Sequence, residues 1–259
     1  MQTLRDVVQY RELFYAFVKR DLMVRYKQTA FGVAWVVMQP LLTGVIFAVL
    51  FGMISGRFSG MKDVVFFLAA LVPWAPFQNG VQMAANSMEM NANLISKVYF
   101  PRLVIPGAYI CGSVIDFLIT FCVLLIAAAA AGQFTLWLLV MMPPLLVIQC
   151  AAGWGLGLFF AALNAQYRDI KYAVPFILQT GMFLTVLIPV SRWKDIHPAL
   201  HFLMTLNPMA GVVETYRAAL TDAPMDFSLL ARAIIVSFLL LVFGIRFFAA
   251  REQKLIDIL

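Results

Sequence analysis

The chain has 259 residues, of which 63% are hydrophobic and only 12% are charged. Too few polar side chains are present to cover a water-facing globule, so a soluble fold is excluded. The 19 Lys and Arg residues outnumber the 13 Asp and Glu residues, but they gather at the ends of apolar runs, without interleaved aromatics. No nucleic acid is therefore expected as a partner, and the fold class predicted is an all-α integral membrane protein.

The first element, residues 1–30, is predicted to be a cytoplasmic interface helix. Residues 7–27 are too charged to span a membrane, yet a helical projection separates two faces. The apolar face carries Tyr10, Leu13, Phe14, Phe17, Val18 and Val24, and the charged face carries Glu12, Lys19, Arg20 and Lys27. Asp21 and Arg25 interrupt the apolar face at a spacing of four, with the acid first, which favours an ion pair. A simple anchor and a role in transmitting force both fit this pattern.

Six later segments are apolar and long enough to span a membrane, which takes about 20 helical residues. They are residues 31–54, 64–85, 104–131, 136–163, 172–190 and 229–250. With both termini in the cytoplasm, 13 of the Lys and Arg residues fall on the inner side and six on the outer side, as the positive-inside rule requires. Residues 31–259 are therefore expected to form one transmembrane domain with six transmembrane helices.

Aromatic and amide side chains recur in the first two spans, with Trp35 and Gln39 in the first and Trp74 and Gln78 in the second. Aromatic rings stack on the apolar faces of sugars, and amides bond their hydroxyl groups. These residues, with Asp116, form the candidate translocation path. The alternative is that the tryptophans anchor helices at the membrane interface and the amides join neighbouring helices.

The third span contains Asp116, the one acid deep inside an apolar run. An ionisable residue in such a position needs a partner. Counting residues at a rise of ~1.5 Å places Gln149 of the fourth span at a similar depth, and Thr185 of the fifth span is the alternative partner. A structural role for Asp116 and a role on the transport path both stay open.

Two connections are predicted on the cytoplasmic side. The loop between the second and third spans presents Leu94 and Ile95 beside Lys97, and a short helix with an apolar surface suits a groove on a partner protein. The connection between the fourth and fifth spans places Arg168 and Asp169 in one turn. This pair is either an ion-pair lock or part of a positively charged inner flank.

On the outer side, residues 191–228 between the fifth and sixth spans are predicted to hold two short helices. Residues 199–206 and 211–220 are apolar enough for helices, and Asn207 followed by Pro208 favours a turn between them. Two re-entrant or gate helices in the outer leaflet and a surface hairpin are both compatible with this segment.

Catalytic chemistry is not expected in this chain. It lacks the G-x-x-x-x-G-K-[ST] loop that cradles phosphates, so ATP hydrolysis must take place in another polypeptide. His197 and His201 are four residues apart, but the glutamate of the zinc-protease pattern is missing and Pro198 disfavours helix at His197. No metal site and no cofactor are predicted, and the chain is not expected to be an enzyme.

Four ordered motifs resemble the ABC-2 type permeases of the polysaccharide, O-antigen and lipopolysaccharide-type export family. They are RYKQTAFGVAWVVMQPLL at 25–42, NANLISKVYFPRLVIPGA at 91–108, LNAQYRDIKYAVPFILQ at 163–179 and LNPM at 206–209. The resemblance covers nearly the whole chain. One departure is FLTVLIPVSRW at 183–193, where members of the family commonly carry a Thr-Pro pair followed by a Tyr-Pro pair.

The resemblance implies a homodimeric permease subunit in the bacterial inner (cytoplasmic) membrane, paired with two copies of a nucleotide-binding ATPase subunit that binds ATP and Mg. The substrate it implies is a polysaccharide on an undecaprenyl-type lipid carrier, threaded between the protomers. It assigns ATPase coupling to Asn91, Asn93, Leu94, Ile95, Lys97, Tyr99, Phe100 and Arg102. It assigns the outer gate to Asn207, Pro208, Glu214 and Tyr216. The alternative function is a membrane-embedded enzyme of lipid-linked glycan synthesis.

Overall fold

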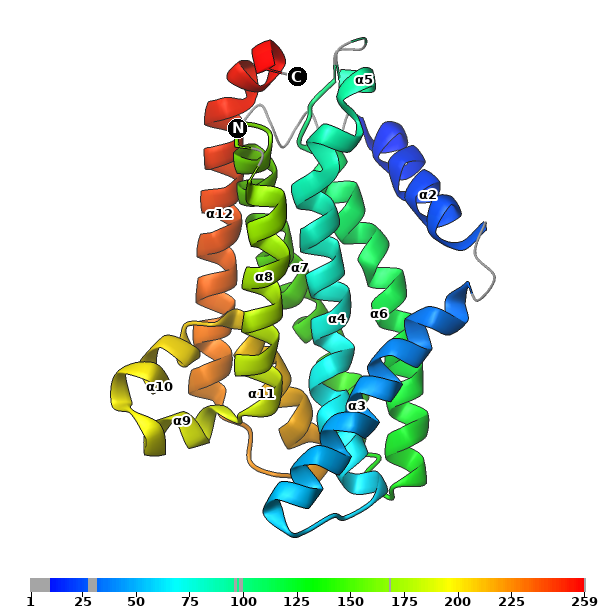
Figure 1. Cartoon of the computed structure of the whole chain (residues 1–259), viewed down its shortest axis with the longest axis vertical. Helices are drawn as coiled ribbons and strands as arrows, with labels where there is room; N and C mark the ends of the chain where they lie inside the picture. Colours follow the sequence, from blue (N-terminus) through cyan, green and yellow to red (C-terminus); the bar gives the residue numbers. More distant parts are fainter. Residues whose placement is uncertain (1–9, 28–31, 96, 98–99, 168, 259) are drawn as a thin grey trace.

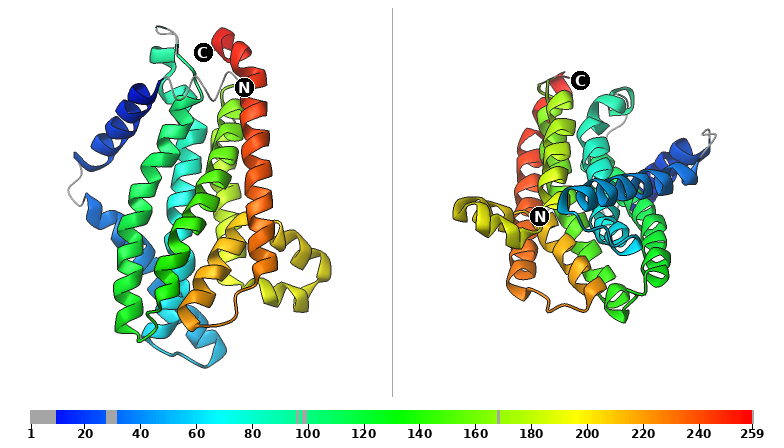
Figure 2. Two further views of the ribbon diagram at one scale, coloured as in Figure 1. Left: turned by 180° about the vertical axis from the view of Figure 1, so that it is seen from behind. Right: turned by 60° about the horizontal axis from the view of Figure 1, so that its bottom comes forward.

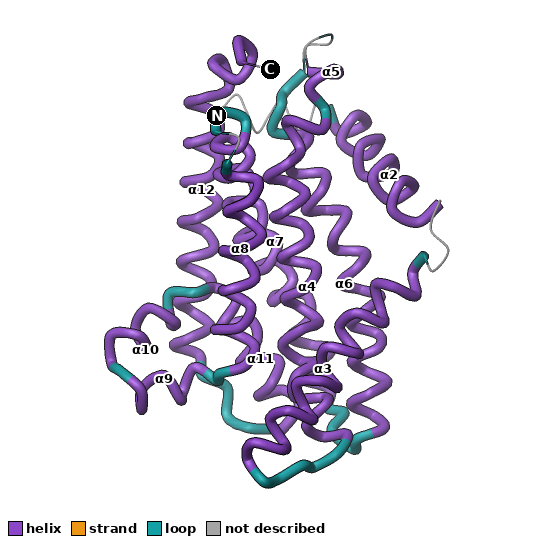
Figure 3. Tube along the Cα trace, in the orientation of Figure 1, coloured by secondary structure: helices purple, strands orange, loops and turns teal. Residues whose placement is uncertain are grey.

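The computed structural model is a helical bundle with no strand among the residues it describes, which are 10–27, 32–95, 97, 100–167 and 169–258 (Figures 1 and 3). In this part of the chain, six helices are long and apolar enough to cross a membrane. They are α3 (Val33–Ser55), α4 (Met61–Met90), α6 (Val104–Ala130), α7 (Leu136–Asn164), α8 (Ile170–Met182) with its π-helical continuation η1 (Phe183–Leu187), and α12 (Phe227–Ile258). The predicted six-span, all-α membrane fold is confirmed.

Several helices extend beyond the predicted spans. Helix α4 has 30 residues, so it is about 45 Å long and exceeds the ~30 Å hydrocarbon layer. Its two internal prolines, Pro73 and Pro76, do not end it, because packed neighbours can stabilise a helix around a proline. The fifth span is shorter than predicted. It ends at Leu187 in η1, and Pro189 precedes the next helix.

Helix α4 forms the centre of the bundle. It packs against α3, α6, α7 and α8, and 78% of its most apolar 18-residue window is buried. The corresponding buried share is only 17% for α3 and 28% for α8 with η1. Helix α3 runs obliquely over α4 and α6 (Figures 1 and 2). For α12 the share is 22%, so large apolar faces of α3, α8 and α12 are left uncovered by the other described residues.

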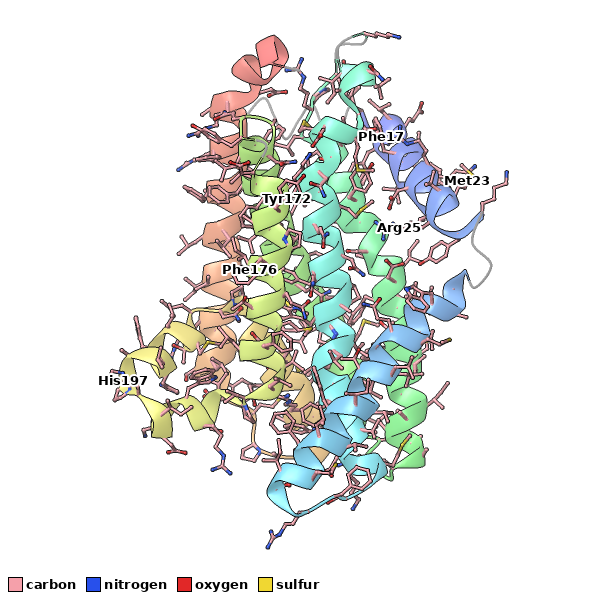
Figure 4. All side chains as sticks on the ribbon, viewed as in Figure 1. Phe17, Met23, Arg25, Tyr172, Phe176 and His197 are labelled. Atoms are coloured by element: carbon pink, nitrogen blue, oxygen red, sulfur yellow. The ribbon has the colours of Figure 1, made fainter. Side chains whose placement is uncertain are left out.

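Helix α2 (Arg11–Lys27) packs against α6, slanted relative to the long axis of the bundle (Figure 1). The predicted apolar face is largely confirmed. Phe17 is buried, and Tyr10, Leu13, Phe14 and Val18 pack partly buried against the core. Val24 is the exception, since it is 72% exposed. Figure 4 shows Phe17 and Arg25 on the side of α2 toward the bundle and Met23 on the opposite side.

The connection between the fifth and sixth spans contains three helices where two were predicted. Helices α10 (Pro198–Thr205) and α11 (Pro208–Thr221) match the predicted pair and flank the predicted turn. Helix α9 (Val190–Ile196) was missed, because its first residue was assigned to the fifth span and the rest to a loop. Helices α9 and α10 project sideways from the bundle (Figure 1), whereas α11 packs against α4, α7 and α12.

Helices α7 and α12 touch through their backbones at two glycines. A side chain at Gly155 would clash with the backbone of Leu240, and one at Gly244 would clash with the carbonyl group of Gly155. Nearer the start of α12, a Cβ atom at Gly211 of α11 would lie 2.6 Å from Cβ of Ala233. Helix α12 is thus held closely against α7 in its middle and against α11 near its start.

The close contact between α7 and α12 predicts that alanine destabilises the protein at one glycine of α7 and not at another. Gly155→Ala should lower the free energy of unfolding by roughly 1–3 kcal/mol, the usual cost of forcing extra atoms into a packed interface. Gly153→Ala is the matched control, because a Cβ atom there would lie 3.5 Å from the Phe77 ring, an ordinary contact. Thermal unfolding of both variants in one detergent measures the difference. Equal stability of the two variants would contradict the crossing.

Candidate functional site

The predicted coupling loop follows α4 and is braced by α2. Asn91 ends α4, and its side-chain oxygen accepts a hydrogen bond from Nη2 of Arg20 at 2.6 Å. Farther along the loop, the ring of buried Phe100 lies 5.9 Å, centroid to centroid, from the ring of Phe17. Helix α2 therefore contacts both the start and the end of the loop.

Arg102 joins the same loop to the C-terminal helix. Its backbone N–H donates to Oε1 of Glu252 at 3.2 Å, and its Nη1 donates to the backbone carbonyl of Glu252 at 2.9 Å. The Arg102 side chain is buried. Its charge therefore supports the loop from inside and is not presented on the surface.

The other predicted coupling residues differ in exposure. Ile95, at the end of the short helix α5 (Ala92–Ile95), is buried, and Leu94 is half-buried. Asn93 and Lys97 are exposed, and Tyr99 lies outside the described residues. Among the predicted coupling residues that the structure describes, Asn93, Leu94 and Lys97 are thus the ones open to a partner protein.

The predicted partners of Asp116 are wrong. Its Oδ2 accepts a hydrogen bond from Nη1 of Arg25 at 2.7 Å, and the Tyr26 hydroxyl donates to its Oδ1. Gln149 is buried and its Oε1 has no hydrogen bond in the described structure, while Thr185 is bonded to the outer segment. The prediction compared the depths of residues within the six spans only. The charged partner of Asp116 comes instead from α2, which packs on α6.

Asp21 completes this cluster, and its predicted pairing with Arg25 is confirmed. Oδ2 of Asp21 lies 2.7 Å from Nη2 of Arg25. A Cβ atom at Gly112 of α6 would lie only 2.6 Å from the same oxygen, so the carboxylate reaches α6 because this position has no side chain. Burial raises the pKa of Asp21, and the nearby Arg25 opposes that rise. One guanidinium group lies between two carboxylates.

The proposed lock in the second inner connection stays a prediction. Arg168 lies outside the described residues, and Asp169 is exposed at the start of α8. A different ion pair joins the end of α4 to the start of α8, with Nζ of Lys171 3.5 Å from Oε1 of Glu89. Both side chains are substantially exposed, so this pair adds little stability.

Three predicted path residues meet in one cavity. Gln39, Trp74 and Gln78 line a space of about 310 Å³ between α3, α4 and α8. Nε1 of Trp74 donates to Oε1 of Gln78 at 2.9 Å, and Nε2 of Gln78 donates to Oε1 of Gln179 at 3.4 Å. Gln179 was missed, although its motif was recognised, because sequence spacing does not show that α8 lies beside α4.

The other two predicted path residues do not line this cavity. Trp35 is 57% exposed on α3, as expected for an anchor at the membrane interface. Asp116 lies on α6, where α2 packs. All the residues that line the cavity are uncharged. The site therefore offers amide and hydroxyl groups beside aromatic rings.

Two of the predicted gate residues begin α11. The side-chain oxygen of Asn207 accepts a hydrogen bond from the Met209 N–H at 3.0 Å, and Pro208 occupies the first helical turn, a favourable start. Nδ2 of Asn207 also donates to Oγ1 of Thr185 at 2.8 Å. Tyr216, farther along α11, is fully buried. These contacts fix α11 to the end of the fifth span.

Arg217 was not among the predicted site residues, yet it contacts α11, η1 and α4. It is 4% exposed, and its Nη1 lies 3.1 Å from Oε1 of Glu214. Its Nη2 donates to the Val186 carbonyl, and its guanidinium carbon lies 4.1 Å from the centroid of the Phe66 ring. Burial lowers the pKa of Arg217, while Glu214 raises it. The helical Glu-x-x-Arg spacing was the available sequence signal.

The two histidines have separate roles. His197 precedes α10, and its Nδ1 accepts a hydrogen bond from the Ala199 N–H at 3.2 Å, with Pro198 at the first helical position. His201 lines a different cavity of about 530 Å³ together with Arg217. In the described residues no group of three or more His, Cys, Asp or Glu side chains is arranged to hold a metal ion.

Comparison with known proteins adds independent findings. The family described as "ABC-2 type transporter" matches residues 12–221. The chain is 28% identical over 257 residues to the O-antigen export system permease protein RfbA of Myxococcus xanthus, with 98% of each chain covered. It is 26% identical over 250 residues to a protein of the same name from Klebsiella pneumoniae, covering 96% of this chain and 95% of the relative.

The Arg25–Asp116 pair predicts coupled stability effects. Arg25→Ala or Asp116→Ala alone should cost about 2 kcal/mol, less than for a fully buried pair because Arg25 keeps some solvent contact. The double variant should cost less than the sum of the two single variants. Unfolding midpoints of the purified variants measure this coupling, with Lys27→Ala on the exposed side of α2 as the control. Strictly additive costs would contradict the pairing.

Proposed function

The chain belongs to the ABC-2 type transporter family, and we propose on this basis that it exports O-antigen-like polysaccharide across the bacterial inner membrane. It is a multi-pass membrane protein and the permease subunit of an ABC exporter, not an enzyme. Relatives that match nearly its full length are named O-antigen export system permeases, which supports polysaccharide as the cargo.

The family pairs such a permease with an ATP-binding subunit. We propose that ATP and Mg bind there and not to this chain, because the sequence has no phosphate-binding loop. The exposed residues Asn93, Leu94 and Lys97 are proposed to contact that subunit. Buried Asn91 is bonded to α2 and buried Arg102 is bonded to α12. A displacement of the loop would therefore be transmitted to both helices.

The uncharged amide cavity is the observation that carries this proposal. It lies beside α3 and α8, which together with α12 are the least buried of the six spans. A second copy of the chain would cover these apolar faces, and the homodimer would then enclose a path lined by Gln39, Gln78 and Gln179. Amide groups of this kind bond sugar hydroxyls without selecting for charge.

Trp74 does not stack on sugar rings in this proposal, but positions a neighbouring amide. It is buried and donates its indole N–H to Gln78. It therefore orients the amide toward Gln179 and leaves sugar stacking to other rings. An undecaprenyl-type lipid carrier is the proposed membrane anchor of the glycan, since a polymer without such an anchor would not be retained at the bilayer.

The orientation completes the proposal. With both termini in the cytoplasm, the coupling loop and the end of α12 lie inside, at the same end of the bundle (Figure 1). The α3–α4 connection and α9–α11 then lie outside. The alternative, an embedded enzyme of glycan synthesis, is not favoured, because the relatives are named as permeases.

The coupling assignment is tested on the exposed loop residues. Lys97→Glu combined with Leu94→Ala should lower export by about tenfold, because interface energy is concentrated in a few contacts, and should weaken copurification with the ATP-binding subunit. Lys62→Glu, an exposed base on the opposite end of the bundle, is the control. Undiminished export in the loop variant would remove this assignment.

Deletion of the gene tests the function itself. The proposal predicts that polysaccharide disappears from the cell surface while finished lipid-linked polymer accumulates inside. The chemical composition of the retained polymer would identify the cargo. If the polymer is never assembled, the chain acts in synthesis and the export proposal fails.

A further inference from the structure

A second cavity lies at the end of the bundle opposite the coupling loop. It has a volume of about 380 Å³ and is bounded by α3, α4, η1 and the start of α9. Its wall is mainly apolar, and the rings of Phe51 and Phe67 lie 5.4 Å apart, centroid to centroid. Leu187 and Ile188 continue this apolar surface. The cavity has the lining expected for hydrocarbon.

Two arginines from distant parts of the sequence line the same cavity. Arg57 comes from the α3–α4 connection and Arg192 from α9. Both are exposed, and neither guanidinium group has a hydrogen bond or an ion pair with another described residue. The only acid in the lining is Asp63, whose Oδ2 accepts a hydrogen bond from the Ser59 N–H at 2.6 Å. The cavity therefore has an excess of positive charge.

The backbone near each arginine is held in place. Oγ of Ser55 donates to the Arg57 carbonyl at 3.1 Å, and Gly56 between them adopts a positive φ of 65° that favours glycine. The Arg192 N–H donates to the Pro189 carbonyl at 3.0 Å in the first turn of α9. Both bases are thus presented from turns with defined hydrogen bonds.

We propose that this cavity binds a phosphate-bearing phospholipid of the outer leaflet. Its phosphate lies between Arg57 and Arg192, because guanidinium groups match phosphate oxygens in charge and geometry. One acyl chain packs on Phe51, Phe67 and Leu187. A free anion would gain nothing from the apolar wall, whereas an amphiphile uses both parts of the site.

A lipid bound in this cavity would affect the position of the link between η1 and α9. The cavity is bounded by η1 and by the link into α9, where the fifth span passes into the proposed gate. A bound lipid would hold this link against α3. The outer location rests on the orientation in the proposed function, but lipid binding by the purified protein does not depend on the identity of the cargo.

Native mass spectrometry of the purified full-length chain, titrated with phosphatidylglycerol, tests the site. The wild-type chain should retain one phosphatidylglycerol per protomer more tightly than the others. Arg57→Gln with Arg192→Gln should weaken this retention by about tenfold or more, since hydrogen bonds to charged groups are lost. Lys62→Gln removes an exposed base at the same end of the bundle, outside the cavity, and should retain lipid as the wild type does. Equal retention by the double variant and the wild type would overturn the proposal.

Two further experiments distinguish binding of a phospholipid from binding of a free phosphate ion. Leu187→Trp should fill the apolar wall and reduce retention with both arginines intact, whereas unchanged retention would contradict a site for the acyl chain. Inorganic phosphate should not displace the lipid, and efficient displacement would show that only a free anion is recognised.

Labelling of Arg57→Cys in whole cells by a membrane-impermeant reagent tests the outer location separately from lipid binding and from export.

Discussion

An ionised carboxylate inside a membrane span must meet an opposite charge, because an unpaired charge in hydrocarbon costs several kcal/mol. Asp116 meets this constraint through Arg25 and Tyr26, and the half of the bundle that carries the predicted coupling loop depends on that contact. It holds α2 along α6, which brings Phe17 and Arg20 against that loop. The buried charge is thus used to place a helix, and the cavity between α3, α4 and α8 is left uncharged.

The contacts form a continuous route through the molecule. The inner loop is joined to α12 through Arg102 and Glu252. Helix α12 crosses α7 at Gly155 and Gly244, and it reaches α11 at Gly211. In turn α11 is tied to the end of the fifth span by Asn207 and Arg217 and to the start of α9 by Glu214. Packed, hydrogen-bonded elements of this kind can carry a displacement between the two ends of a permease, provided that they have two stable arrangements.

The parts of the structure that depend on local pattern could be predicted from the sequence. The six spans follow from length and hydropathy, the faces of α2 and the Asp21–Arg25 pair follow from helical spacing, and the α10–α11 turn follows from Asn207 and Pro208. The partner of Asp116 and the position of Gln179 could not be predicted, because both depend on which helices lie side by side. Helix α9 was missed because a π-helical turn ends the fifth span early.

The most direct test of this account measures export in the Asp116→Asn variant. The introduced amide oxygen can still accept the hydrogen bond from Arg25, whose charge stays paired with Asp21. Since the account gives Asp116 a positioning role, export should stay close to the wild-type level. Loss of export in a variant that inserts and folds normally would show that the charge itself is used, and would place Asp116 on the transport path.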